Sequence, residues 1–184
     1  MKAFKYLMVF IFLNASIICL AQQESTPTDE VIVHDPVAIK SNGKYYLFCT
    51  GRGIAMFSSE DLEEWKREAP VFSKKPEWTD SVVPNFGNHI WAPDITEFEG
   101  SFYLYYSVSA FAKNTSAIGL AINKTLDVDS PDYKWEDQGI VIESIPNRDL
   151  WNAIDPNLIF DEEGTLWLSF GSFWEGLKLV KLSS

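Results

Sequence analysis

Two aspartates, Asp35 and Asp155, are the residues of this sequence best suited to carry out chemistry. Each is followed directly by a proline and stands at the same point of a unit that recurs along the chain. Two carboxyl groups held near each other can divide acid and base work, because one takes a proton while the other gives or steers one. Asp-Pro is also a common pair at turns and strand starts, so either aspartate alone could be structural.

The recurring unit is a short stretch followed by a turn glycine. It occurs three times, as Asp35–Ile39 before Gly43, Ala92–Thr96 before Gly100 and Asp155–Ile159 before Gly164. The turn glycines lie 57 residues apart (100 minus 43) and then 64 apart (164 minus 100). Each turn leads into a run of aromatic and aliphatic residues typical of strands. The pairs Asn42-Gly43, Glu99-Gly100 and Glu163-Gly164 are therefore predicted to be hairpin turns.

A fainter repeat follows each of these runs, and no segment has a convincing helical period. Its members are Gly53–Phe57, Ile118–Ile122 and Gly176–Val180. Each period then holds about four strands, which is the content of one propeller blade. The sequence predicts an all-β fold, an incomplete β-propeller of about two blades and most of a third. The alternative is a smaller, self-contained β-fold of three units.

The residues around the repeat starts carry a family resemblance. His34-Asp35-Pro36, Trp91–Ile95, Asn152–Asn157 and Gly171–Trp174 occur in this order within Val33 to Leu182. In this combination they resemble glycoside hydrolase family 43, and within it the arabinan endo-1,5-α-L-arabinosidases, or arabinanases. The resemblance implies a five-bladed propeller with inverting chemistry, and covers the N-terminal portion of such an enzyme.

The resemblance also implies roles for individual residues. Asp35 matches the general base that activates water, and Asp155 matches the acid that tunes the pKa of the proton donor and orients it. Trp91 could stack on a sugar ring, as could Phe111, although a core position suits Trp91 equally well. The positions that match the lining of the family's substrate site are Gly119, Asn152, Ala153, Ile154, Asp155, Ser172, Phe173 and Trp174.

Two parts of the family pattern have no match in this sequence. The proton donor of the family is a later glutamate, and none of Glu143, Glu162, Glu163 and Glu175 matches it. The histidine that holds the family's central calcium or other ion would also lie beyond Ser184, and no metal-ligand spacing occurs in this span. No cofactor is therefore required by these residues. We expect a truncated chain that is inactive by itself.

Composition limits the partners. A net charge of −11 disfavours nucleic acid and anionic membranes, whereas a neutral polysaccharide such as arabinan is not repelled. Aromatic residues make up 15% of the chain, which suits both sheet cores and sugar stacking. The function expected is endo-acting arabinan hydrolysis. The alternatives are an exo-acting arabinofuranosidase or β-xylosidase, or a non-catalytic carbohydrate-binding propeller; oligomeric state cannot be predicted.

The N-terminus has the organisation of a signal peptide. Lys2 and Lys5 precede the apolar stretch Tyr6–Leu20, so residues 1–21 are expected to be a leader, 22–30 a linker and 31–184 the propeller. A secreted or periplasmic protein without a membrane segment follows; a retained anchor and a lipoprotein with Cys19 lipidated are the alternatives. Without the leader only Cys49 remains, which is expected to be a buried small hydrophobe and leaves no intrachain disulfide.

Overall fold

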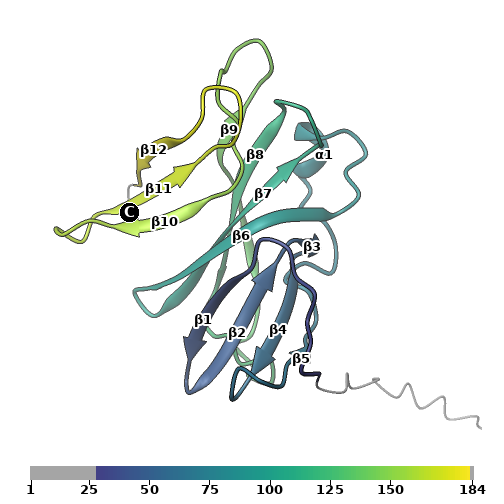
Figure 1. Cartoon of the computed structure of the whole chain (residues 1–184), viewed down its shortest axis with the longest axis vertical. Coiled ribbons are helices and arrows are strands. Elements are labelled where there is room, and N and C mark those ends of the chain that lie inside the picture. The colour runs from purple at the N-terminus through teal and green to yellow at the C-terminus, as the bar shows by residue number, and fades with distance from the viewer. Residues whose placement is uncertain (1–27, 183–184) are drawn as a thin grey trace, which may run out of the picture.

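A computed structural model describes residues 28–182 as three antiparallel sheets (Figure 1). The first sheet has the order β1-β2-β4-β5, the second β3-β6-β7-β8-β9 and the third β10-β11-β12. The first sheet contains β1 (Val37–Ser41), β2 (Lys44–Cys49), β4 (Ala55–Ser59) and β5 (Lys66–Arg67). The second contains β3 (Gly51–Arg52), β6 (His89–Phe98), β7 (Ser101–Ser109), β8 (Ser116–Asn123) and β9 (Glu136–Ser144). The third contains β10 (Asn157–Phe160), β11 (Leu166–Phe170) and β12 (Lys178–Lys181).

The predicted hairpins are confirmed. Asn42 and Gly43 both have left-handed backbone, with φ of 50° and 85°, and Glu99 and Gly100 repeat this with 50° and 73°. Two consecutive left-handed residues match the right-handed twist of the flanking strands, which closes a two-residue turn. The third turn is longer, and the Asp161 carboxylate accepts the backbone N–H of Thr165 at 2.7 Å within it.

The fainter repeat forms the third strand of each unit. Its members lie over β4, β8 and β12, which pair with β2, β7 and β11 respectively. The all-β prediction is confirmed, with one departure. Residues Thr79–Val82 form a single helical turn, α1, which is too short to give a helical period in the sequence.

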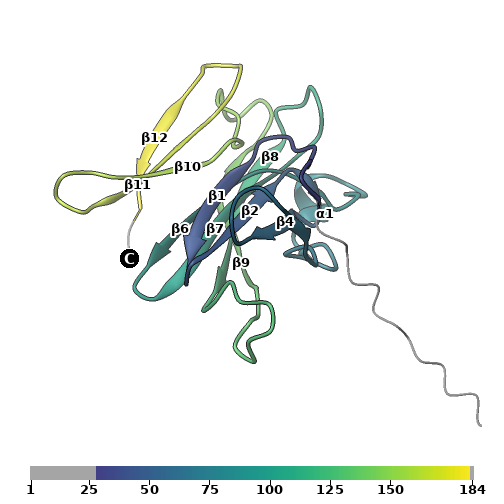
Figure 2. The ribbon, with the colours of Figure 1, turned by 60° about the horizontal axis from the view of Figure 1, so that its bottom comes forward.

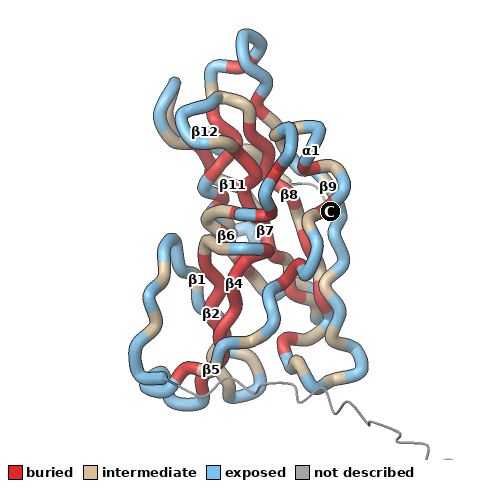
Figure 3. The backbone as a smooth tube through the Cα atoms, turned by 90° about the vertical axis from the view of Figure 1, so that its right-hand side faces the viewer, coloured by how far each residue is buried: buried red, intermediate tan, exposed pale blue. Residues whose placement is uncertain are grey.

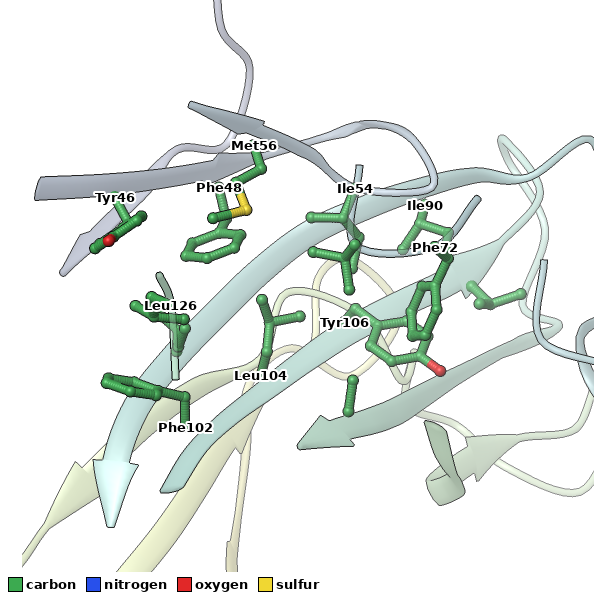
Figure 4. Close-up of a cluster of buried hydrophobic side chains, with 14 of the residues drawn as sticks. Tyr46, Phe48, Ile54, Met56, Phe72, Ile90, Phe102, Leu104, Tyr106 and Leu126 are labelled. Carbon is green, nitrogen blue, oxygen red and sulfur yellow. The ribbon is translucent and has the colours of Figure 1, made fainter. Parts of the chain in front are cut away.

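The second sheet lies between the other two (Figures 1 and 2). On one face of β7, Leu104 and Tyr106 are fully buried against side chains of the first sheet such as Phe48 and Met56 (Figure 4). On the opposite face, Tyr105 packs in a smaller cluster with residues of the third sheet, which include Leu168 and Phe170. Successive residues of β7 therefore serve two cores, which explains its continuous run of aromatic and aliphatic residues.

Burial is concentrated in the strands of these two cores (Figure 3). Each large apolar side chain buried there contributes about 1.5–3 kcal/mol relative to exposure. Strand β6 contacts both β1 and β10, so the strands that begin the three repeat units are neighbours. Because β1 and β10 follow Asp35 and Asp155 directly, this packing decides where the two aspartates lie.

The region before the first sheet is described from Thr28 onward. Thr28 and Trp65 exchange backbone hydrogen bonds of 2.9 and 2.7 Å, so the end of the expected linker lies beside β5. The expected signal peptide, 1–21, lies outside the described residues. Cys49 is buried and free, as predicted. Within residues 28–182, no helix has the length and apolar character needed to cross a membrane.

Candidate functional site

The residue before each repeat proline has the same unusual backbone. Asp35, Ala92 and Asp155 have φ of 52°, 38° and 55°, all in the left-handed region. This conformation costs a non-glycine residue on the order of 1–2 kcal/mol. In β6 the feature is a bulge, since Ala92 and Pro93 interrupt the pairing between Trp91 and Asp94. The strain recurs in all three units, and two of the three carry a carboxylate.

Asp35 is held through one of its two carboxylate oxygens. Its Oδ2 accepts a hydrogen bond from Thr50 Oγ1 at 2.7 Å and lies 2.6 Å from His34 Nδ1, which donates when that nitrogen carries a proton. The Asp35 side chain is 37% exposed, and that of His34 is 81% exposed. No group within residues 28–182 donates a hydrogen bond to Asp35 Oδ1. One oxygen is thus anchored while the other is left for solvent.

Asp155 has a different environment. Its backbone N–H donates to Ser107 Oγ at 3.0 Å, but no described residue donates to its carboxylate. The residue is exposed as a whole, yet surrounding atoms remove water from its carboxyl group. This desolvation raises the pKa of Asp155, the negative charge of Asp35 raises it further, and His34 lowers it. Because the Asp35 charge acts on the Asp155 carboxyl group, and β6 contacts both β1 and β10, the two aspartates lie near each other.

The segment before Asp155 is fixed by buried hydrogen bonds. Ser116 Oγ donates to Asn152 Oδ1 at 2.6 Å and accepts from the Ala153 N–H at 2.9 Å. The carbonyl of Ile154 accepts the Gly171 N–H at 2.8 Å. Asn152, Ala153 and Ile154 are all buried, so in this structure they support the backbone that presents Asp155.

Asp94 holds the strand that follows Asp155. Its Oδ2 accepts the Leu158 N–H at 2.6 Å and lies 3.3 Å from Asn157 Nδ2, which joins β6 to β10. Burial raises the pKa of Asp94. Asp94 thus connects the second sheet to the third beside the site.

Ser172, Phe173 and Trp174 lie in the loop after β11. Phe173 and Trp174 have left-handed φ of 58° and 40°, and their exposures are 81% and 47%. Gly171 lets this loop turn tightly, since a Cβ there would lie 2.7 Å from the Gly176 carbonyl oxygen. The two rings are therefore presented to solvent next to the segment that carries Asp155.

Trp91 and Gly119 both belong to the second sheet. Trp91 is half-buried, precedes the bulge residue Ala92 and pairs with Ser107. Gly119 lies in β8 beneath two rings. A Cβ there would come within 2.6 Å of Tyr106 Cζ and 2.7 Å of Trp78 Cζ2, so glycine makes room for them. In this structure Gly119 shapes the packing below the rings.

Two hydroxyl residues that contact the site, Thr50 and Ser107, were missed by the sequence interpretation. A signal was present, because each stands seven residues after its turn glycine (50 minus 43, and 107 minus 100). A residue at one point of a repeat has the same spatial role in each unit, so this coincidence could have drawn attention to them.

The four glutamates compared above with the family's proton donor make no hydrogen bond or ion pair with Asp35 or Asp155. Glu143 pairs with Arg148 at 3.3 Å and Glu175 lies 3.6 Å from Lys178, while Glu162 and Glu163 are exposed. The charges that shift the pKa of Asp155 are those of Asp35 and His34. Within residues 28–182, no group of three His, Cys, Asp or Glu side chains could hold a metal ion, so these residues alone do not fit the calcium or other ion implied by the resemblance.

The structure thus combines antiparallel propeller-type sheets with two carboxyl groups beside the strands that begin neighbouring units, which suits a glycoside hydrolase. The model of glycosyl hydrolases family 43 matches residues 25–184, and the chain therefore belongs to this family.

Relatives and solved structures agree with this assignment. The chain is 54% identical over 178 residues to an extracellular exo-α-(1→5)-L-arabinofuranosidase of Cellvibrio japonicus, covering 97% of this chain and 49% of the relative. It is 43% identical to an extracellular endo-α-(1→5)-L-arabinanase of Bacillus subtilis, covering 82% and 46%. The chain thus spans about half the length of these curated relatives.

A Cellvibrio cellulosa α-L-arabinanase matches the structure with a TM-score of 0.83 and 58% identity, over 84% of this chain and 49% of the other. The same enzyme has been solved with arabinohexaose, and that structure matches with a TM-score of 0.82. The predicted propeller-type fold is thereby confirmed.

Proposed function

We propose that this chain supplies the general base and part of the substrate site of a secreted enzyme that hydrolyses the arabinan of plant cell walls. The observation that carries the proposal is the proximity of Asp35 and Asp155: they lie just before β1 and β10, which both contact β6, and the Asp35 charge raises the pKa of Asp155. Membership of glycosyl hydrolases family 43 supports it, and so do relatives named as an arabinofuranosidase and as an arabinanase. Two of these relatives are named extracellular, which supports secretion.

Asp35 is proposed to be the general base. With Oδ2 anchored by Thr50 and His34, Oδ1 is free to accept a proton from water. That water attacks the anomeric carbon from the face opposite the leaving oxygen, so the configuration inverts. Inverting enzymes hold base and acid roughly 6.5–9.5 Å apart, which leaves room for the water.

Asp155 is proposed to tune and orient the proton donor. When a carboxylate lies beside a protonated carboxyl group, the carboxyl group loses its proton less readily, because two negative charges would then be adjacent. Asp155 has no hydrogen-bond donor on its carboxylate among the described residues, so its charge is available to act on a neighbouring acid.

The donor itself is not identified among residues 28–182. Glu143 and Glu175 have cationic neighbours of their own, and neither shifts the pKa of Asp155. We therefore propose that the donor lies outside the described residues, in line with the later glutamate that the family resemblance implies.

Four aromatic rings that are exposed or partly exposed are proposed to bind the sugar chain. Phe173 and Trp174 project from the loop after β11, Trp91 lies beside the bulge of β6, and Phe111 is 90% exposed. The apolar faces of pentose rings stack on such side chains. A neutral arabinan also suits a chain of net charge −11. Gly119, Asn152, Ala153, Ile154 and Ser172 complete the proposed lining, either in contact with sugar or in support of those contacts.

Endo-acting cleavage is the mode we propose, as in the relative from Bacillus subtilis. Exo action is the second candidate, and the 54% identity to a relative named as an exo-arabinofuranosidase favours it. A non-catalytic propeller that binds arabinan is the third, since these described residues include no identified donor.

The test is the release of reducing sugar from linear 1,5-α-arabinan by these 184 residues and by the longest form that the locus encodes. Activity in the longer form only is the expected result. Mixed oligosaccharides early in the reaction would indicate endo action, whereas a single small product would indicate exo action. Activity of the 184 residues alone would overturn our account of the donor. Arabinohexaose binding without turnover in either form would leave the binding propeller in place of the enzyme.

A further inference from the structure

Thr50 and Ser107 repeat one contact between neighbouring sheets. Thr50 Oγ1 accepts the backbone N–H of Ala92 at 2.8 Å, and Ser107 Oγ accepts that of Asp155 at 3.0 Å. In both cases the donor is the left-handed residue before the proline of the next unit. In both cases, a hydroxyl group of one repeat unit thus holds the left-handed backbone residue of the following unit.

Thr50 makes a further contact that Ser107 does not make. Its hydroxyl proton is donated to Asp35 Oδ2 at 2.7 Å, and its backbone N–H to the His34 carbonyl at 3.0 Å. A hydroxyl has one proton and two lone pairs, so it can serve the carboxylate and accept from Ala92 at the same time. Thr50 therefore joins the Asp35 carboxylate to the backbone of the second sheet.

The chain of contacts that begins at Asp35 and Thr50 continues through the bulge of β6 to Asp155. Ala92 is adjacent to Trp91, which pairs with Ser107 across β6 and β7. Ser107 is fully buried, so its hydroxyl has a fixed environment, and it holds the Asp155 N–H. Asp35 and Asp155 are thereby connected by two hydroxyl groups and one strand bulge.

We propose that Thr50 and Ser107 are positioning residues that set the placement of the Asp35 and Asp155 carboxylates relative to each other. Their importance for turnover rests on the proposed function, whereas the placement itself can be tested without it. In this arrangement Thr50 holds Asp35 Oδ2 by a hydrogen bond, and Ser107 keeps Asp155 close enough to be influenced by Asp35.

The first experiment titrates the Asp155 carboxyl group by ¹³C NMR with and without Asp35→Asn. The charged groups that act on Asp155 are Asp35 and His34, and loss of the Asp35 charge should lower the pKa of Asp155. In a Thr50→Val background, we expect Asp35→Asn to lower the pKa of Asp155 by less. In a Thr50→Ser background, the full decrease should return. Thr96→Val is the matched control, because Thr96 lies in β6 and its side chain makes no hydrogen bond to a described residue.

In a Ser107→Ala background, Asp35→Asn should likewise lower the pKa of Asp155 by less, and Ser107→Thr should return the full decrease. Ser101→Ala, in β7, is the control. Amide spectra check that each variant is folded. If Asp35→Asn lowers the pKa of Asp155 equally in the unsubstituted, Thr50→Val and Ser107→Ala chains, the proposal is overturned.

The second experiment separates this proposal from the proposed function. In a form that cleaves arabinan, Thr50→Val should lower kcat about tenfold with little change in KM, and Thr50→Ser should recover most of it. If no form cleaves arabinan, the proposed function fails and the titration still decides the positioning role. If arabinan is cleaved but Thr50→Val leaves kcat unchanged, the positioning role fails alone.

Discussion

Asp35 and Asp155 begin equivalent strands with almost the same backbone, φ 52° and 55°, yet their carboxylates have different surroundings. The Asp35 carboxylate accepts from Thr50 and lies against His34, at a position open to water. The Asp155 carboxylate has no donor among the described residues, and desolvation of the carboxyl group and the Asp35 charge raise its pKa.

This difference between the two carboxylates shows which properties of a residue the repeat determines and which it does not. The repeat fixes where a residue stands and how its backbone turns. The neighbours of that residue decide how readily its carboxyl group ionises. Ala92 shows the same point, because it has the backbone of the two aspartates at φ 38° and no carboxylate.

The largest stability effect we predict comes from removing the buried support on the Asp155 side. Ser116→Ala leaves Asn152 Oδ1 and the Ala153 N–H without their partner, and both residues are buried. An unsatisfied buried polar group costs about 1–3 kcal/mol, so we expect a loss of about 2 kcal/mol or more in the free energy of unfolding. Urea denaturation measures it. Ser101→Ala should change little, and equal losses in both variants would refute the role of Ser116.

Asp155→Asn should raise the stability of the folded chain, by less than Ser116→Ala lowers it. Because the pKa of Asp155 is raised on folding, its ionised form opposes folding, and stability falls as pH rises from the usual aspartate pKa through the raised value. Above that window the variant should melt at a higher temperature than the unsubstituted chain, and below it the gain should disappear. Melting curves at several pH values test this.

Asp35→Asn gives the matched comparison. It weakens the hydrogen bonds that Oδ2 accepts from Thr50 and His34, so no such gain is expected. A similar pH-dependent gain in both variants would contradict the difference between the two aspartates.

The smallest effect concerns the shared backbone. Ala92→Gly removes the cost of a left-handed residue but adds the entropy that glycine loses on folding, so we expect a gain of at most about 1 kcal/mol. Ala38→Gly in β1, where φ is not positive, should lose stability instead. The two variants are compared by denaturation in the same buffer, and a loss at Ala92 equal to that at Ala38 would show that its turn is unstrained.

Much of the fold could be predicted from the sequence, because the three turn glycines and the strand runs are local signals. The hairpins at Asn42-Gly43 and Glu99-Gly100 need nothing beyond neighbouring residues. The turn α1 could not be predicted, since four residues give no period. The packing of the two faces of β7 into two different cores could not be predicted either, because it depends on which sheets become neighbours.

The candidate site divides in the same way. Asp35 and Asp155 stand out by their place in the repeat, and the packing of β1 and β10 against β6 places them near each other. The contacts of Thr50 with Asp35 and Ala92 join residues 15 and 42 positions away, which no local pattern shows. The buried Asn152 and Ala153 likewise form their hydrogen bonds with Ser116, more than 30 positions earlier in the chain.

The most direct test of the account is the rate of arabinan cleavage by Asp35→Asn in the form of the protein that is active. General base catalysis contributes about 10²–10⁴-fold, so we predict a loss of that size in kcat, with arabinohexaose binding retained. Activity within a few-fold of the unsubstituted enzyme would contradict the assignment of Asp35 as the base.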